Sequence, residues 1–176
     1  MTVDVPILAT ARLTLRAHRT DDLPAGAAMW ADPAVTRFIG GKPFTPEEVW
    51  ARLLRYAGLW SMLGFGYWAI EETATGRFVG ELGFADFRRA VVPPLDAPEL
   101  GWALVQAVHG QGYATEAVRA VLAWGDARFA RTVCIINPGN HASLRVAAKC
   151  GFQEQWRAAY RDHTTIVLAR TAGGAE

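Results

Sequence analysis

The stretch at residues 108–117, VHGQGYATEA, constrains the fold more than any other part of the chain. It follows a strand-like pattern and leads into an alanine-rich, helix-like segment. Gly110 and Gly112 stand where that helix should begin, although glycine is a poor helix former. The N–H groups at a helix start are unpaired and carry partial positive charge, so they can hold an anion that comes close. We interpret the stretch as a phosphate loop, with a plain strand-to-helix turn as the alternative.

Three kinds of phosphate-binding loop are possible for this stretch. A Walker loop needs Gly-Lys-Ser/Thr, and the stretch contains no lysine. A dinucleotide fold places an acidic residue about 20 positions further on, at the end of the next strand. That strand ends at Asn137-Pro138 without an acid. The third kind binds the pyrophosphate of coenzyme A.

Short strand patterns alternate with longer helix patterns along the 176 residues, which predicts one mixed α/β domain over 1–176. Helices are expected to begin near 20 and near 45, where Thr45 and Glu48 form a capping box, and to cover 112–129 and 142–150. In the third helix we expect Glu116 to pair with Arg119 on the outer face. We expect strands at 12–16, 65–72, 77–87, 99–106, 132–137, 152–160 and 164–170.

Composition excludes several classes of function. A formal net charge of +1 argues against a nucleic-acid partner. No apolar run reaches the roughly 20 residues of a membrane span, and the N-terminus lacks the pattern of a signal peptide. We expect Cys134 and Cys150 to be buried thiols rather than a disulfide or a metal pair, which suits a cytoplasmic protein.

A second motif narrows the ligand. NPGNHASL at 137–144 opens the last helix and KCGF at 149–152 closes it. Together with ELGW at 99–102 and the stretch at 108–117, which we name the glycine loop, they resemble the GCN5-related N-acetyltransferase (GNAT) superfamily. The opening of the chain, ARLTLRAHRTDD, is similar to the RimJ/RimL branch, and the resemblance spans almost the whole chain. It implies an α/β (α+β) GNAT fold: a mixed, mostly antiparallel seven-stranded sheet, splayed between strands 4 and 5, with about four flanking helices.

The resemblance also implies acetyl-CoA as co-substrate and no metal. Backbone amides of the loop would bind its pyrophosphate, at His109, Gly110, Gln111, Gly112, Tyr113, Ala114 and Thr115. His109 departs from the family pattern, which has Arg or Gln there. The splayed strand would pair with the pantetheine arm at Trp102, Ala103, Leu104 and Val105. Asn140, Ser143 and Arg145 would assist, although Asn140 is also a candidate helix cap and Arg145 a candidate surface residue.

The expected reaction is direct attack of a neutral primary amine on the thioester. Glu99 is the first candidate for the base, with Glu81 second, and a backbone N–H near Ala103 or Leu104 would stabilise the oxyanion. Many members carry a tyrosine, where this chain has Ala147, that acts as the general acid for the leaving thiolate. Ser143 matches the serine proposed for that task in the RimL-like branch.

The acceptor amine, from a peptide N-terminus or a small molecule, is not defined by the sequence. Candidate acceptor-site residues are aromatic: Phe38, Phe44, Trp68, Phe84 and Trp102. The alternative is core filling, which is the commoner use of tryptophans in a small domain with seven of them. Two alternatives stay open. One is transfer from another acyl-CoA such as succinyl-CoA, with Arg88 or Arg89 as donor, and the other is a non-enzymatic acyl-CoA-binding module. The resemblance also raises the option of a homodimer.

Overall fold

The computed structural model describes residues 4–173. All of its strands belong to one sheet in the order β1-β2-β3-β4-β5-β6-β8-β7. Neighbours are antiparallel except β5 and β6. The elements along the chain are β1 (Leu8–Ala9), β2 (Leu13–Arg16), η1 (Thr20–Asp22), α1 (Leu23–Ala31), α2 (Pro33–Thr36), α3 (Pro46–Leu63), β3 (Tyr67–Glu72), β4 (Arg77–Ala85), β5 (Glu99–Leu104), η2 (Gln106–Val108), α4 (Tyr113–Asp126), β6 (Arg131–Ile136), α5 (His141–Lys149), β7 (Gln153–Tyr160) and β8 (His163–Thr171).

The expected mixed, mostly antiparallel sheet is confirmed, with eight strands in residues 4–173 rather than seven. The additional strand is β1, a two-residue edge that pairs Leu8 with Leu15. There are five α-helices in this range instead of about four, because Pro33 starts the short helix α2 directly after α1. Asp32 caps α2 by accepting from the Ala34 N–H. The Thr45–Glu48 capping box is confirmed at the start of α3.

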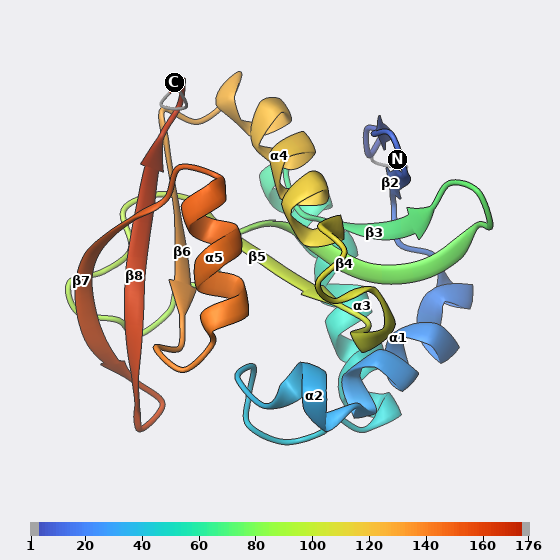
Figure 1. The fold of residues 1–176 in the computed structure, drawn as a ribbon, viewed down its shortest axis with the longest axis horizontal. Helices are drawn as coiled ribbons and strands as arrows, with labels where there is room; N and C mark the ends of the chain where they lie inside the picture. The colour runs from blue at the N-terminus through green and yellow to red at the C-terminus, as the bar shows by residue number, and fades with distance from the viewer. Residues whose placement is uncertain (1–3, 174–176) are drawn as a thin grey trace.

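The sheet separates two helical layers (Figure 1). On one face α4 and α5 cover the main core, into which α4 buries Ala117, Val118, Val121 and Leu122. On the other face α1 and α3 pack against side chains of β4 and β5 that include Phe78, Ala85 and Ala103. Cys134 and Cys150 are buried free thiols, as expected. No helix within 4–173 has both the length and the apolar character to cross a membrane.

Candidate active site

Within the glycine loop, Gly112 is the residue that caps the start of α4. Gly110 and Gly112 have φ of +74° and +81°, a backbone conformation that side chains disfavour. Within residues 4–173, no protein acceptor is bonded to the backbone N–H groups from Gly110 to Thr115. A β-carbon at Gly110 would meet nothing within 4 Å. The loop therefore has both an open approach and free donors for an anion.

Glu116 fixes this loop to the start of the chain. Its carboxylate accepts from the Arg12 Nε at 2.7 Å and from the Thr10 hydroxyl at 2.6 Å. The expected pair with Arg119 is wrong, because Arg119 donates instead to the Lys149 carbonyl at 3.3 Å. Long-range contact with the β1–β2 turn has overridden the local helical spacing.

Strands β5 and β6 diverge at the side of the sheet that leads to the glycine loop. The two parallel strands pair only at Glu99 and Val133, and in Figure 1 they then separate behind α5. The Val105 N–H donates to the Val79 carbonyl. The backbone N–H and C=O groups of the odd-numbered residues of β5 therefore point toward β4. Because ladder bonds alternate along a strand, Trp102 and Leu104 direct their backbone groups toward the divergence.

His109 occupies one of these groups. Its ring nitrogen Nε2 donates to the Leu104 carbonyl at 2.9 Å. The Leu104 N–H and both backbone groups of Trp102 are then left facing the divergence. Of the four predicted pantetheine partners, Ala103 and Val105 use their backbone groups on β4 instead.

The start of α5 borders the same opening. Asn140 caps the helix by accepting from the Ser143 N–H at 3.1 Å. Its side-chain nitrogen bonds none of the residues that the structure describes, so capping leaves a donor free. Ser143 is half-buried and Arg145 is exposed on α5.

Glu99 is 5% exposed and lies at the start of β5. Both of its oxygens accept from Arg89, at 2.5 Å from Nε and 2.7 Å from Nη2. Arg89 also donates to the Tyr160 hydroxyl at 2.9 Å. Both oxygens of the first candidate for the base are therefore occupied by one guanidinium.

Glu81 is 4% exposed and opposes Ala103 across β4 and β5. One oxygen, Oε1, accepts from the Tyr56 hydroxyl at 2.5 Å and from the Trp30 indole at 3.1 Å. The other oxygen bonds none of the described residues. Burial raises the pKa of Glu81, and the positive charge of nearby Arg52 offsets this only in part.

Tyr67 lies between these carboxylates on the same face of the sheet. Its ring stacks on Tyr56 with centroids 4.3 Å apart. A β-carbon at Gly101 would lie 2.2 Å from the Tyr67 hydroxyl oxygen. Burial and the charge of Glu99 raise the pKa of Tyr67, so the hydroxyl stays neutral. Glycine at 101 is required for this close approach.

The five aromatic residues predicted for the acceptor site do not form one pocket. Trp68 and Phe84 are 0% exposed in the main core, so their prediction as pocket residues is corrected. Phe44 stacks on Trp30, Phe38 lies beside Gly139, and Trp102 packs at the edge of the main core. Hydrophobic burial, rather than recognition, accounts for Trp68 and Phe84.

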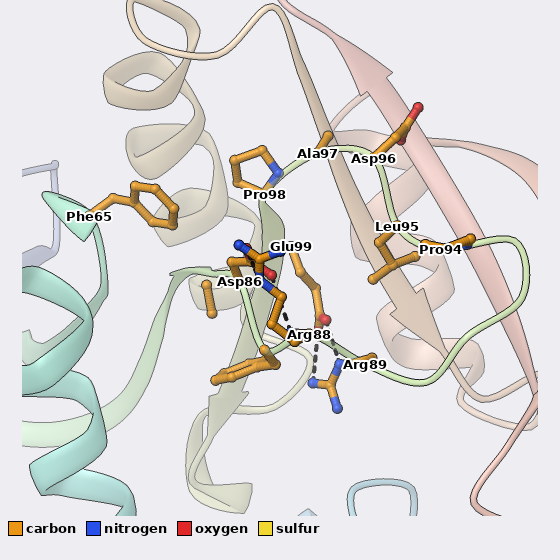
Figure 2. Close-up of a pocket in the computed structure, with 12 residues that line it drawn as sticks. Phe65, Asp86, Arg88, Arg89, Pro94, Leu95, Asp96, Ala97, Pro98 and Glu99 are labelled. Carbon is orange, nitrogen blue, oxygen red and sulfur yellow. Dashed lines mark hydrogen bonds and ion pairs between the residues drawn. The ribbon is translucent and has the colours of Figure 1, made fainter. Parts of the chain in front are cut away.

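A pocket of about 510 Å³ does lie at the Glu99 end of β5. Figure 2 shows Phe65 on one side and the loop of residues 88–98 on the other, with Glu99 and Arg89 joined between them. Sequence reasoning missed this pocket. The available signal was the loop with three prolines, which leads directly into Glu99.

Among residues 4–173, no cluster of three or more His, Cys, Asp or Glu side chains could hold a metal ion. The polar groups that meet around β5 are backbone donors, a helix cap and buried carboxylates. Such an arrangement suits an extended ligand that has a phosphate at one end and, at the other, a reacting group that needs hydrogen-bond donors and a carboxylate.

Comparison with known proteins agrees with this arrangement. The family model described as an acetyltransferase (GNAT) domain matches residues 12–153. The uncharacterized N-acetyltransferase YoaA of Bacillus subtilis (strain 168) is 28% identical over 85% of this chain and 84% of its own length. YkkB, an uncharacterized protein of the same organism, is 36% identical over half of this chain and 51% of its own length.

Solved structures extend the similarity to the fold. A putative GNAT-family acetyltransferase from Bordetella pertussis is 29% identical, with a TM-score of 0.82 over 95% of this chain and 100% of that chain. A RimL ribosomal-protein acetyltransferase in complex with coenzyme A shares the fold at 19% identity, with a TM-score of 0.78 over 97% of this chain and 100% of that chain. With its glycine loop, diverging strands and a family match over residues 12–153, this chain belongs to the GNAT acetyltransferase family.

Proposed function

We propose that this protein transfers the acetyl group of acetyl-CoA to a primary amine by direct attack on the thioester. One observation carries the proposal. The N–H groups of the glycine loop that have no partner among residues 4–173, and the backbone groups of Trp102 and Leu104 that face the divergence, supply donors and acceptors from the loop into β5, and Glu81 lies opposite Ala103 on the neighbouring strand β4.

These groups match the chemistry of the donor substrate. The loop amides from Gly110 to Thr115 would bind the pyrophosphate, since they lie at the positive end of α4. The amides of the pantetheine arm would pair with the Leu104 N–H and the Trp102 carbonyl, as an added strand does. Asn140 would donate to the same arm with its free side-chain nitrogen.

Glu81 supports the proton transfer better than Glu99. An acceptable base must be unpaired and must have a pKa near the working pH. Glu81 has one oxygen without a partner among residues 4–173 and a raised pKa, whereas Arg89 occupies both oxygens of Glu99. We therefore assign Glu81 as the base, acting directly or through one water.

The remaining steps use groups that border the divergence. As the amine nitrogen bonds to the carbonyl carbon, negative charge develops on the carbonyl oxygen, and the Trp102 N–H, next to Ala103 in β5, would stabilise it. The carbon–sulfur bond then breaks, and the thiolate of coenzyme A leaves. The Ser143 hydroxyl at the start of α5 would donate to that thiolate.

The acyl group is proposed to be acetyl rather than succinyl. A succinyl group carries a carboxylate that needs an unpaired cation. Arg89 is paired with Glu99, and Arg88 is paired with Asp86 at 2.9 Å. Neither guanidinium offers a free charge to the acyl end.

Acetyl-CoA binding and release of the coenzyme A thiol over a panel of amines test the proposal. We expect binding without an acceptor, and thiol release only when a primary amine is added. Gly112→Val should abolish binding, since the substitution strains a φ of +81° and covers the loop. Gly76→Val is the matched control, with φ of +69° in the β3–β4 hairpin, and should retain it. Binding without amine-dependent release from any acceptor contradicts the proposal.

A further inference from the structure

The pocket at the Glu99 end of β5 has a largely apolar lining. We name it the β4–β5 pocket, because the loop of residues 88–98 that joins these strands forms one side of it. Its volume of about 510 Å³ lies within the range of small-molecule sites. Its apolar side chains come from both sides, from Phe65, Phe87, Pro94, Leu95 and Pro98.

Every charged side chain of this pocket already has a partner of opposite charge. Arg89 holds Glu99, and Arg88 lies 2.9 Å from Asp86. Asp96 is paired with Arg131 from β6. The pocket therefore presents no unpaired carboxylate to a cationic ligand.

The pocket also lies at the closed end of the divergence. Glu99 pairs with Val133 at the point where β5 and β6 still meet, and its side chain contributes to the pocket lining. An arm that follows β5 from the glycine loop runs toward Glu99. The acyl end of such an arm would stop near Trp102, so the pocket lies beyond it along the same strand, where the rest of the acceptor could extend.

We propose that the β4–β5 pocket binds the non-reacting part of the acceptor, and that this part is an apolar or aromatic group without a second positive charge. This inference rests on the proposed transfer to an amine. A second ammonium group would lose its hydration in the pocket without gaining a carboxylate partner. A phenyl or branched alkyl group loses nothing comparable and gains contact with Phe87 and Leu95.

The same chemistry occurs in free arylalkylamines and in peptides whose first residue is aromatic. Initial rates of thiol release should be measured with phenethylamine, a tripeptide with N-terminal phenylalanine, spermidine and putrescine. We expect kcat/KM for at least one aromatic amine to exceed that for spermidine by about 10-fold or more. The ratio between the first two substrates distinguishes a small amine from a peptide end.

Leu95→Asp places an unpaired carboxylate in the pocket. It should lower the preference for the aromatic amine over spermidine by about 10-fold, mainly through KM. Leu54→Asp is the matched control, because Leu54 is 51% exposed on α3 and lies outside the pocket lining. A thermal melt checks that each variant is folded. Phe87→Leu, which keeps the pocket apolar but widens it, should shift the preference toward bulkier aromatic amines.

The outcomes separate the two proposals. Thiol release that favours spermidine, or a preference unchanged by both Leu95→Asp and Phe87→Leu, overturns the pocket assignment and leaves the transferase proposal standing. Acetyl-CoA binding with no release from any amine overturns both.

Discussion

The carboxylate of Glu116 is bound by Arg12, 104 residues earlier in the chain, through a side-chain bond of 2.7 Å from Nε and a backbone bond of 2.9 Å. Arg12 also donates from Nη1 to the Gln111 carbonyl at 3.0 Å, and its guanidinium covers the Tyr113 ring. A carboxylate in the first turn of α4 interacts favourably with the helix dipole but repels a nearby phosphate. Arg12 neutralises it and holds the loop at the same time.

Arg12→Ala should therefore weaken acetyl-CoA binding. We expect KM for acetyl-CoA to rise about 10-fold, since the loop loses an anchor and Glu116 its counter-charge, with kcat changed by less than about threefold. Arg12→Lys should restore part of the affinity by returning the charge. Arg119→Ala is the control, because Arg119 donates to the Lys149 carbonyl and not to Glu116. An equal rise in KM for Arg119→Ala would show that the long-range pair is unimportant.

Glu81 and Glu99 make opposite predictions for the pH dependence of the rate. Since burial raises the pKa of Glu81, a reaction that needs its carboxylate should lose rate as pH falls through a value above that of an ordinary glutamate. Glu81→Gln should lower kcat by about 10²-fold or more and remove this acid limb. The measurement is kcat against pH for both variants.

Glu99→Gln serves as the counterpart. Its side chain would lose the ion pair with Arg89 but no proton transfer, so we expect a smaller fall in kcat and an unaltered acid limb. An acid limb that survives Glu81→Gln and vanishes in Glu99→Gln would move the base to Glu99.

Gly101 and Tyr67 should show strong coupling in stability. In Gly101→Ala the new methyl group would lie 2.2 Å from the Tyr67 hydroxyl oxygen, and Tyr67 is fixed by stacking on Tyr56. We expect a loss of about 1–3 kcal/mol in the free energy of unfolding. Tyr67→Phe removes the clashing oxygen, and the next ring atom is an ordinary 3.4 Å away.

Urea unfolding of the two single variants and the double variant measures this coupling. The double variant should recover most of the stability that Gly101→Ala loses. Losses that simply add would mean that the strand shifts to admit the methyl group.

Local signals in the sequence were sufficient for much of the fold. The start of α3 is encoded by Thr45, Pro46 and Glu48 within four residues, and the structure has that capping box. The glycine loop was likewise visible, because a positive φ and a helix start are properties of a few consecutive residues. The divergence of β5 and β6 came from the resemblance to a family and not from any pattern in the chain.

Contacts between distant residues were not available in the same way. Glu116 has a suitable partner in Arg119 one turn away, and only the fold reveals that Arg12 is preferred. The sequence left both a pocket and a core open for Trp68 and Phe84, because an aromatic side chain has the same character in either place. Pairing of Glu99 with Arg89 likewise depends on how the loop of residues 88–98 folds back over β5.

We expect the buried imidazole of His18 to make the protein less stable in acid. Burial lowers the pKa of His18 to about 4, with Asp22 opposing and Arg16 reinforcing the shift, while the unfolded chain has the ordinary value of 6.5. Between these values the unfolded state binds more protons than the folded state. The stability linked to His18 is therefore complete above pH 6.5 and is lost as pH falls through about 4.

The loss attributable to His18 should approach about 3 kcal/mol at the acid end of this range. His18→Phe keeps an aromatic ring beside Tyr56 and should flatten the fall in stability between pH 7 and pH 5. Urea unfolding at a series of pH values measures this. His163→Gln is the control, because His163 is exposed on β8 and should leave the profile unchanged. A profile equally steep in His18→Phe would assign the acid sensitivity to the carboxylates, such as Asp22, whose pKa is lowered by its bonds to Arg16 despite burial.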